Sequence, residues 1–234
     1  MIFIFLIFFS LFSSCPSDPQ LPSDQIRVIV FDFGEVVVQK NFDPLAQFLA
    51  TELDITFEQG KAILVEREEA LLRSESEKLF FKNVFHNFGK EVPQQFYKKF
   101  RKKMVDCIFF DKKVVEIIEN LKEQNRRVIL FSNTEKHKAD IYRELGYYAP
   151  FDQLVLSYEI GMRKPQKAAY DYVEKQAHFL PHEALFIDNK IENVLQAKKH
   201  HWNALLFSSP EQLKKDLEEL GFCFDQDFTQ KRGE

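Results

Sequence analysis

The sequence predicts an α/β fold: a Rossmann-like, doubly wound parallel sheet with an inserted α-helical cap. Three observations support this prediction. Short apolar runs alternate with longer amphipathic stretches from Ile26 onward. The short runs are continuously apolar, as in parallel strands that helices cover on both faces. The stretch between the first run and Lys112 has no convincing strand pattern and is too long for a structureless loop inside a domain.

Five runs are expected to form the strands of the sheet. They are Arg27 to Phe31, Arg127 to Phe131, Leu154 to Leu156, Ala184 to Ile187 and Ala204 to Phe207. Helical patterns lie between and after them, at Lys112 to Gln124, His137 to Leu145, Gln166 to Ala177, Ile191 to His201 and Pro210 to Leu220. Because strand and helix patterns alternate along the chain, the strands are expected to run parallel to one another.

The inserted segment, residues 41–106, is predicted to be a helical cap with a small core of its own. Its helical patterns cover Pro44 to Leu53, Phe57 to Leu72, Glu77 to Phe88 and Pro93 to Met104. The side chains expected to form its core are Phe80, Phe81, Phe85, Phe88, Phe96 and Phe100. Residues 26–40 and 107–222 would then make up the main domain, followed by a tail at 223–234.

Residues 1–25 form a hydrophobic leader and linker that is a possible signal. The apolar run from Met1 to Phe12 is shorter than the roughly 20 residues that a membrane-spanning helix needs. Ser13, Ser14 and Cys15 resemble the end of a bacterial lipoprotein signal, but no Lys or Arg precedes the run. We favour a cytoplasmic product that begins close to Ile26, with a secreted or lipid-anchored protein as the alternative.

The composition excludes several classes of function. The 32 basic and 36 acidic side chains leave a net charge of −4, so no general attraction for nucleic acid is expected. The seven glycines are too widely spaced for a G-x-G-x-x-G dinucleotide fingerprint or a G-x-x-x-x-G-K phosphate loop. The sequence gives no basis for inferring a protein partner.

Polar side chains follow four of the predicted strands. In chain order they are Asp32, Ser132 with Asn133, Lys164, and Asp188 with Asn189. One Asp after a strand is usually a turn or cap residue, but four such positions at carboxyl ends of parallel strands point to one shared crevice. A carboxylate that attacks phosphorus requires a divalent cation, so Asp32 and Asp188 would share Mg²⁺. Ser132 and Lys164 would hold phosphate oxygens.

At these positions the sequence resembles the haloacid dehalogenase (HAD) superfamily. The motifs are FDFGEV around Asp32, LFSNT around Ser132, YEIGMRKP around Lys164 and FIDNKIENV around Asp188. Their order and spacing match the family over roughly Ile26 to Phe222. Within the superfamily the chain is most similar to bacterial α-D-glucose-1-phosphate phosphatases and to the phosphatase domain of soluble epoxide hydrolases.

The resemblance implies a two-step hydrolysis of a small phosphorylated metabolite such as a sugar phosphate. Asp32 would form an aspartyl-phosphate, with Ser132, Lys164 and Asp188 completing the catalytic set. Ser132 and Lys164 would also bind the substrate, and the insert would be the cap that closes over it.

The resemblance also implies further ligands around this catalytic set. Asn133 and Arg163 would join Ser132 and Lys164 in binding the substrate. Mg²⁺ would be held by Asp32, the carbonyl of Gly34, Asp188 and Asn189.

Two departures from the family pattern predict a weakened activity. Gly34 stands where most family phosphatases carry a second Asp that acts as general acid and base, and Glu35 is the candidate replacement. Asn189 stands where a second acid often binds the metal, so Mg²⁺ affinity should fall, and Asn193 could add a contact.

Two alternative functions stay open at this point. In a 2-haloacid dehalogenase, Asp32 would attack carbon and no metal would be needed. In a non-catalytic HAD-like binding protein, Gly34 and Asn189 would mark a site that has lost its chemistry. The retention of Asp188 favours the phosphatase over the dehalogenase.

Overall fold

The computed structural model describes residues 22–73 and 75–224. Most of the predicted leader, with Cys15, and most of the predicted tail lie outside these described residues. Within them, the structure contains no helix that is both long and apolar enough to cross a membrane.

A five-stranded parallel sheet forms the centre of the molecule, in the order β5-β4-β1-β6-β7. The strands are β1 (Val28–Phe31), β4 (Arg127–Ser132), β5 (Gln153–Leu156), β6 (Ala184–Asp188) and β7 (Asn203–Leu206). Each lies within one residue of its predicted bounds at either end. The predicted Rossmann-like α/β fold is confirmed.

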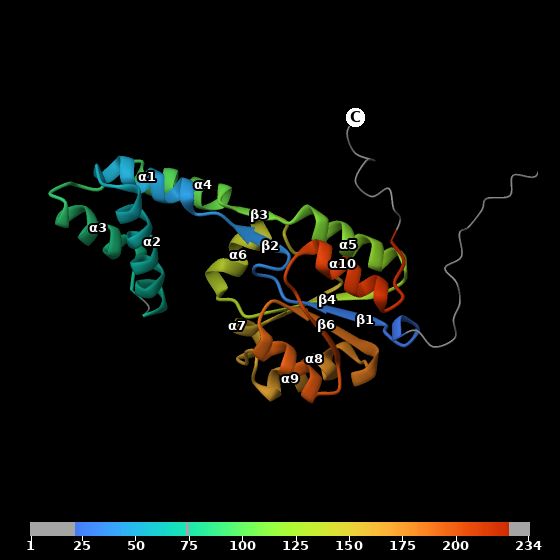
Figure 1. Ribbon diagram of the computed structural model, residues 1–234. Coiled ribbons are helices and arrows are strands. Elements are labelled where there is room, and N and C mark those ends of the chain that lie inside the picture. Colours follow the sequence, from blue (N-terminus) through green and yellow to red (C-terminus); the bar gives the residue numbers. More distant parts are fainter. Residues whose placement is uncertain (1–21, 74, 225–234) are drawn as a thin grey trace, which may run out of the picture.

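Helices cover both faces of this sheet (Figure 1). They are α5 (Lys112–Glu123), α6 (Lys136–Glu144), α7 (Ser157–Ile160), α8 (Lys167–Ala177), α9 (Ile191–Lys199) and α10 (Pro210–Glu219). Two short 3₁₀ turns, Pro22–Asp24 and Pro181–Glu183, precede β1 and β6. Asp111 caps the first turn of α5, because its side chain accepts hydrogen bonds from the backbone N–H groups of Lys113 and Val114.

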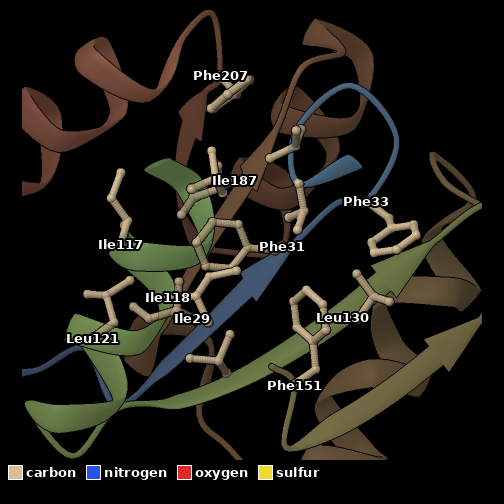
Figure 2. Packing of buried hydrophobic residues seen from close by; sticks show 14 of the residues in the cluster. Ile29, Phe31, Phe33, Ile117, Ile118, Leu121, Leu130, Phe151, Ile187 and Phe207 are labelled. Carbon is tan, nitrogen blue, oxygen red and sulfur yellow. The ribbon is translucent and has the colours of Figure 1, made fainter. Parts of the chain in front are cut away.

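Alternate residues of each strand supply the two cores. Ile29 and Phe31 of β1 pack with Ile117 and Leu121 of α5, as Figure 2 shows. The neighbouring residues Val28 and Val30 face the opposite layer, which α8 and α9 cover. This division explains why the strands are continuously apolar in sequence: both of their faces are buried.

The inserted segment is helical, as its periodicity indicates. Its helices are α1 (Asp43–Leu53), α2 (Phe57–Leu72), α3 (Glu77–Asn87) and α4 (Phe96–Asp106), and they project from one side of the sheet (Figure 1). A capping box starts α2, in which Thr56 and Gln59 each accept a hydrogen bond from the other's backbone N–H. The division of the chain into core and cap at residues 41 and 106 stays a prediction.

Two short strands at the base of the insert were not predicted. β2 (Val38–Lys40) and β3 (Ile108–Phe110) pair antiparallel and join the insert to the rest of the chain. The prediction that this stretch lacks strands is therefore wrong. Strands of three residues are too short to produce a recognisable period of two.

The insert has a phenylalanine-rich core that matches the prediction except at one position. Phe80, Phe81, Phe85, Phe96 and Phe100 are buried together, and the Phe81 and Phe96 rings meet edge to face at 4.9 Å. Phe88 is 40% exposed, so its predicted place in this core is wrong. It lies just after the end of α3, where the side chain no longer follows the buried face of the helix.

Candidate active site

Three predicted site residues lie side by side at the carboxyl ends of the central strands. Asp32 directly follows β1, Ser132 is the last residue of β4 and Asp188 is the last residue of β6. Since β1 lies between β4 and β6, these side chains share one edge of the sheet. All three are buried.

A buried lysine joins the two carboxylates. The Lys164 ammonium lies 2.6 Å from Asp32 Oδ1 and 2.7 Å from Asp188 Oδ2, and its side chain is 1% exposed. Burial raises the pKa of Asp32, while the Lys164 charge acts in the opposite direction. Without a cation between them, two buried carboxylates would repel each other, so the lysine compensates their charge.

The backbone of Lys164 is held by Asn133. Lys164 N–H donates to Asn133 Oδ1 at 2.9 Å, and Asn133 Nδ2 donates to the Lys164 carbonyl at 2.9 Å. Ser157 fastens the same loop, since its hydroxyl accepts from Thr134 N–H at 2.9 Å and donates to the Thr134 carbonyl at 3.0 Å. In this structure, the predicted substrate ligand Asn133 therefore has both amide atoms engaged in positioning Lys164.

Asp188 is oriented from its own loop and from α9. Its Oδ1 accepts a hydrogen bond from Lys190 N–H at 2.8 Å, and its Oδ2 accepts one from Asn193 Nδ2 at 2.9 Å. Tyr170 in turn donates its hydroxyl to the Asn193 carbonyl at 2.9 Å. Asn193, which the sequence suggested as a further metal contact, presents its amide N–H to Asp188 and so positions this carboxylate.

The turn after β1 brings Glu35 next to Asn189. Asn189 Nδ2 donates to Glu35 Oε2 at 3.0 Å, whereas Asn189 Oδ1 is buried without a hydrogen-bond partner. Glu35 adopts a left-handed conformation with φ of 64°. A Cβ atom at Gly34 would meet nothing within 4 Å, so this position has room for the side chain that Gly34 lacks.

The oxygen atoms at this edge of the sheet fit a hard divalent cation. Two carboxylates, Asp32 and Asp188, and the unpartnered amide oxygen of Asn189 are the donor types that Mg²⁺ accepts. A buried oxygen without a hydrogen-bond partner, in the residue that follows Asp188, is a feature that a bound cation would explain. Within residues 22–73 and 75–224, no group of three or more His, Cys, Asp or Glu side chains could hold a metal ion, so the candidate site here depends on two carboxylates and neutral oxygen donors.

Arg163 lies apart from this buried group. Its side chain is exposed and lines a small cavity of about 270 Å³ with Asn133, Thr134 and Tyr158. Its backbone N–H donates to Gln166 Oε1 at 3.0 Å. The predicted substrate-binding role of Arg163 stays a prediction.

A second, larger cavity of about 670 Å³ lies between the insert and the core. Glu35 lines it on the core side, together with Lys138 and Tyr142 of α6. Burial raises the pKa of Tyr142, whose ring packs edge to face on Phe33 at 4.9 Å. Lys138 and Tyr142 were not predicted from the sequence, because an amphipathic helix shows no signal for which of its residues face a cavity.

The sheet order, the strand-end carboxylates and the central lysine define a class of hydrolase. A family model for haloacid dehalogenase-like hydrolases matches residues 26–201 of the chain. The protein belongs to this family and is a hydrolase.

Two relatives of the chain are named as phosphatases. A sesquiterpene phosphatase of Aspergillus oryzae is 26% identical over 175 residues, which cover 74% of this chain and 85% of that protein. A D-ribitol-5-phosphate phosphatase of Bacteroides thetaiotaomicron is 27% identical over 185 residues, which cover 72% and 85%.

The fold also resembles solved structures. A HAD family enzyme of Bacteroides thetaiotaomicron, in complex with magnesium and inorganic phosphate, superimposes with a TM-score of 0.55 at 19% identity. The match covers 78% of this chain and 94% of that chain. At this identity the likeness shows the shared fold.

Proposed function

We propose that the protein is a Mg²⁺-dependent phosphatase that hydrolyses a small phosphomonoester through an aspartyl-phosphate on Asp32. The observation that carries this proposal is the buried group of Asp32, Lys164 and Asp188 at the carboxyl ends of adjacent strands. The phosphatase activities named for the two relatives support the same reaction class.

In the first step, an Asp32 oxygen attacks phosphorus and the bond from phosphorus to the ester oxygen breaks. The departing alkoxide takes up one proton. The Lys164 ammonium offsets negative charge on Asp32 and on the transferring phosphoryl group, and the Ser132 hydroxyl donates to a phosphoryl oxygen. In the second step, water attacks the aspartyl-phosphate, which releases phosphate and regenerates the Asp32 carboxylate.

The metal would be held by Asp32, Asp188, the amide oxygen of Asn189 and the carbonyl of Gly34. A divalent cation supplies charge neutralisation for the phosphoryl oxygens when it is bound. With two carboxylates and neutral donors, the site carries less charge than one with a third acid at position 189, so we expect weak binding.

Glu35 is the proposed proton donor in place of the acid that Gly34 lacks. Its carboxyl group lies in the turn that follows Asp32, contacts Asn189 at 3.0 Å and lines the larger cavity. A carboxyl group at the mouth of the cavity can protonate the leaving alkoxide and then accept a proton from the attacking water. The four helices of the insert would act as the cap that selects the leaving group.

A screen of phosphate release tests the proposal. We expect turnover of some compounds from a set of sugar phosphates, nucleotides and small phosphomonoesters in Mg²⁺, and loss of it in EDTA. Asp32→Asn provides the inactive control. Halide release from 2-haloacids that persists in EDTA would instead identify a dehalogenase. Absence of turnover together with absence of beryllium fluoride binding would identify a non-catalytic binding protein.

A further inference from the structure

We propose that the cavity between insert and core binds an apolar substrate body, so that the substrate is the phosphomonoester of an apolar alcohol. This inference rests on the proposed phosphatase function and specifies its substrate class. It predicts that the protein prefers such a compound to a phosphorylated sugar or polyol, which the same reaction could also hydrolyse.

The cavity is large enough for more than a short chain. Its volume is about 670 Å³, within the range of roughly 300–1,000 Å³ that small-molecule sites span. Residues of α1, α2 and α4 form its wall on the side of the insert, and residues of the β1–β2 segment and α6 form the wall on the side of the core. The substrate body would therefore lie between the two parts of the chain.

Apolar and aromatic side chains line this cavity from both sides. They include Phe42, Leu64, Val65, Met104, Ile141 and Tyr142. Val65 is 61% exposed and Phe42 is 40% exposed, although both are apolar and both face the cavity. Apolar surface left open in a concave site is typical of a place where an apolar ligand is buried.

Several charged side chains around the cavity form ion pairs within the protein. Lys61 pairs with Asp43 at 3.3 Å, and Arg67 pairs with Glu77. Lys138 contacts Glu68 and Glu135; burial by itself would lower the pKa of Lys138, but these hydrogen bonds outweigh it and raise this pKa. The charges of these paired side chains are compensated within the protein and do not need an ionic ligand.

Neutral polar side chains are scarce in the lining of this cavity. Among the described residues that border the cavity, there is no Ser, Thr, Asn or Gln. Glu35, Lys40 and His137 also belong to the lining, and all three lie on the core side. The hydroxyl groups of a polyol would therefore have to pair with charged side chains of the lining, most of which already form ion pairs within the protein, and unpaired buried hydroxyls cost free energy.

The cavity lining approaches the catalytic group through neighbouring residues, although Asp32 and Asp188 themselves are not part of it. Glu35 belongs both to the cavity lining and to the hydrogen bond with Asn189, next to Asp188. Tyr142, on the same core-side wall, packs on Phe33, the residue that follows Asp32. A phosphate group bound at Asp32 would thus leave its ester substituent directed toward the apolar walls.

A homologous series of alkyl phosphates tests the inference. Ethyl, butyl, hexyl and octyl phosphate are compared with glucose 6-phosphate by phosphate release in Mg²⁺, all below the concentration at which octyl phosphate forms micelles. Burial of each methylene contributes about 0.8 kcal/mol, so we expect kcat/KM to rise about two- to fourfold per added carbon. A flat series, or a higher kcat/KM for glucose 6-phosphate than for octyl phosphate, would overturn the inference.

A matched pair of variants places the effect in the cavity. Val65→Asp puts a charge on its wall, and we expect the ratio of kcat/KM for octyl over ethyl phosphate to fall about tenfold or more. Leu79→Asp changes a 50% exposed apolar residue of the insert outside the cavity, and should leave that ratio as in the unchanged protein. Equal ratios for the two variants would contradict the assignment of the cavity.

A binding measurement separates this inference from the proposed function. Octylphosphonate has no ester bond to hydrolyse, and its binding in Mg²⁺ is measured by calorimetry at two temperatures. We expect binding with a negative heat-capacity change that Val65→Asp weakens and Leu79→Asp does not. If no phosphomonoester is hydrolysed but octylphosphonate binds in this way, the phosphatase proposal fails and the apolar site stands. No binding of octylphosphonate would overturn the apolar site itself.

Discussion

The two ends of the proposed substrate site are built on opposite principles. At the strand ends, Asp32, Lys164 and Asp188 are 8%, 3% and 0% exposed, and the Lys164 ammonium contacts both carboxylates. In the cavity between the insert and the core, exposed charged side chains form ion pairs, and apolar side chains such as Val65 are exposed to solvent. The strand ends thus contain buried charged side chains, whereas the cavity contains solvent-exposed apolar side chains.

This difference assigns chemistry and selection to separate parts of the chain. Buried charges are stable only with partners in a fixed geometry, so each member of the strand-end group constrains the others. An open apolar wall has no such requirement, and its side chains can be replaced without leaving a buried charge unpaired. We therefore expect substitutions at the strand ends to affect activity and stability together, and substitutions in the insert to affect substrate preference.

The largest effect is expected from Asp32→Asn, which removes the nucleophile and keeps the side-chain volume. Turnover should fall by at least about 10³-fold, because the covalent step has no replacement nucleophile. Asp171→Asn is the matched control, since Asp171 pairs with Lys167 on the surface, and it should retain activity within about twofold. Phosphate release in Mg²⁺ measures both variants. Activity of Asp32→Asn close to that of the unchanged protein would refute the role of Asp32.

Lys164→Met should give the next largest effect, on stability as well as on activity. It leaves the Asp32 and Asp188 carboxylates buried without their shared ammonium, which should lower the free energy of unfolding by about 3–5 kcal/mol. Lys167→Met removes an exposed ammonium that is 73% accessible and should change this free energy by less than about 1 kcal/mol. Urea unfolding compares the two.

Added Mg²⁺ sharpens the Lys164 experiment. A cation bound between the carboxylates would replace the missing charge, so Mg²⁺ should stabilise Lys164→Met more than it stabilises the unchanged protein. Equal stabilisation of both proteins would argue against a cation site at Asp32 and Asp188. Equal stability of the Lys164→Met and Lys167→Met variants would show that the buried carboxylates tolerate each other.

The sequence was sufficient for the fold and for the residues that meet at the strand ends. A continuous apolar run such as Arg127 to Phe131 can be recognised as a buried strand without knowledge of the strand order in the sheet. Parallel pairing then brings the carboxyl ends of these strands to one edge of the sheet. The partner of each polar atom was not visible. The residue type of Asn133 permits a contact to substrate or to backbone, and only the three-dimensional path of the loop directs both amide atoms to Lys164.

The cavity could not be predicted from the sequence, for a related physical reason. Its walls combine α2 of the insert with α6 of the core, and the packing of two helices that are far apart in the chain leaves no local pattern. Phe88 shows the same limit within the insert, because a residue at the end of a helix can turn outward while the helical period predicts burial. Local periodicity thus predicts buried faces better than the surfaces between separately folded segments.

A smaller effect, confined to some substrates, is expected from Glu35→Gln. Loss of a general acid should reduce turnover of octyl phosphate by about 10²-fold, because an alkoxide is a poor leaving group. Turnover of p-nitrophenyl phosphate should change less than about threefold, since its leaving group departs without a proton. Glu66→Gln, an exposed change outside the cavity, is the control. Equal losses for the two substrates would exclude proton donation by Glu35.

Asn189→Asp should change the metal requirement while retaining the reaction. A third negative charge beside Asp188 should lower the Mg²⁺ concentration for half-maximal activity by about tenfold, because affinity rises with the charge of the ligands. The new carboxylate would repel Glu35, which contacts Asn189 Nδ2, so the double variant with Glu35→Gln isolates the metal effect. An unchanged Mg²⁺ requirement in both would show that residue 189 does not bind the metal.

The smallest effect is expected where the insert meets the core through surface charge. Arg101 of α4 and Glu144 of α6 form an ion pair at 3.0 Å, with side chains 63% and 65% exposed. A double-mutant cycle with Arg101→Ala and Glu144→Ala should give a coupling of less than about 0.5 kcal/mol, reduced further at high salt. A coupling above about 1.5 kcal/mol would mean that this pair fastens the insert to the core. The insert would then be held to the core by this ion pair as well as by packing. Substrate selection in the insert would in that case be less independent of catalysis in the core than the comparison of the two regions indicates.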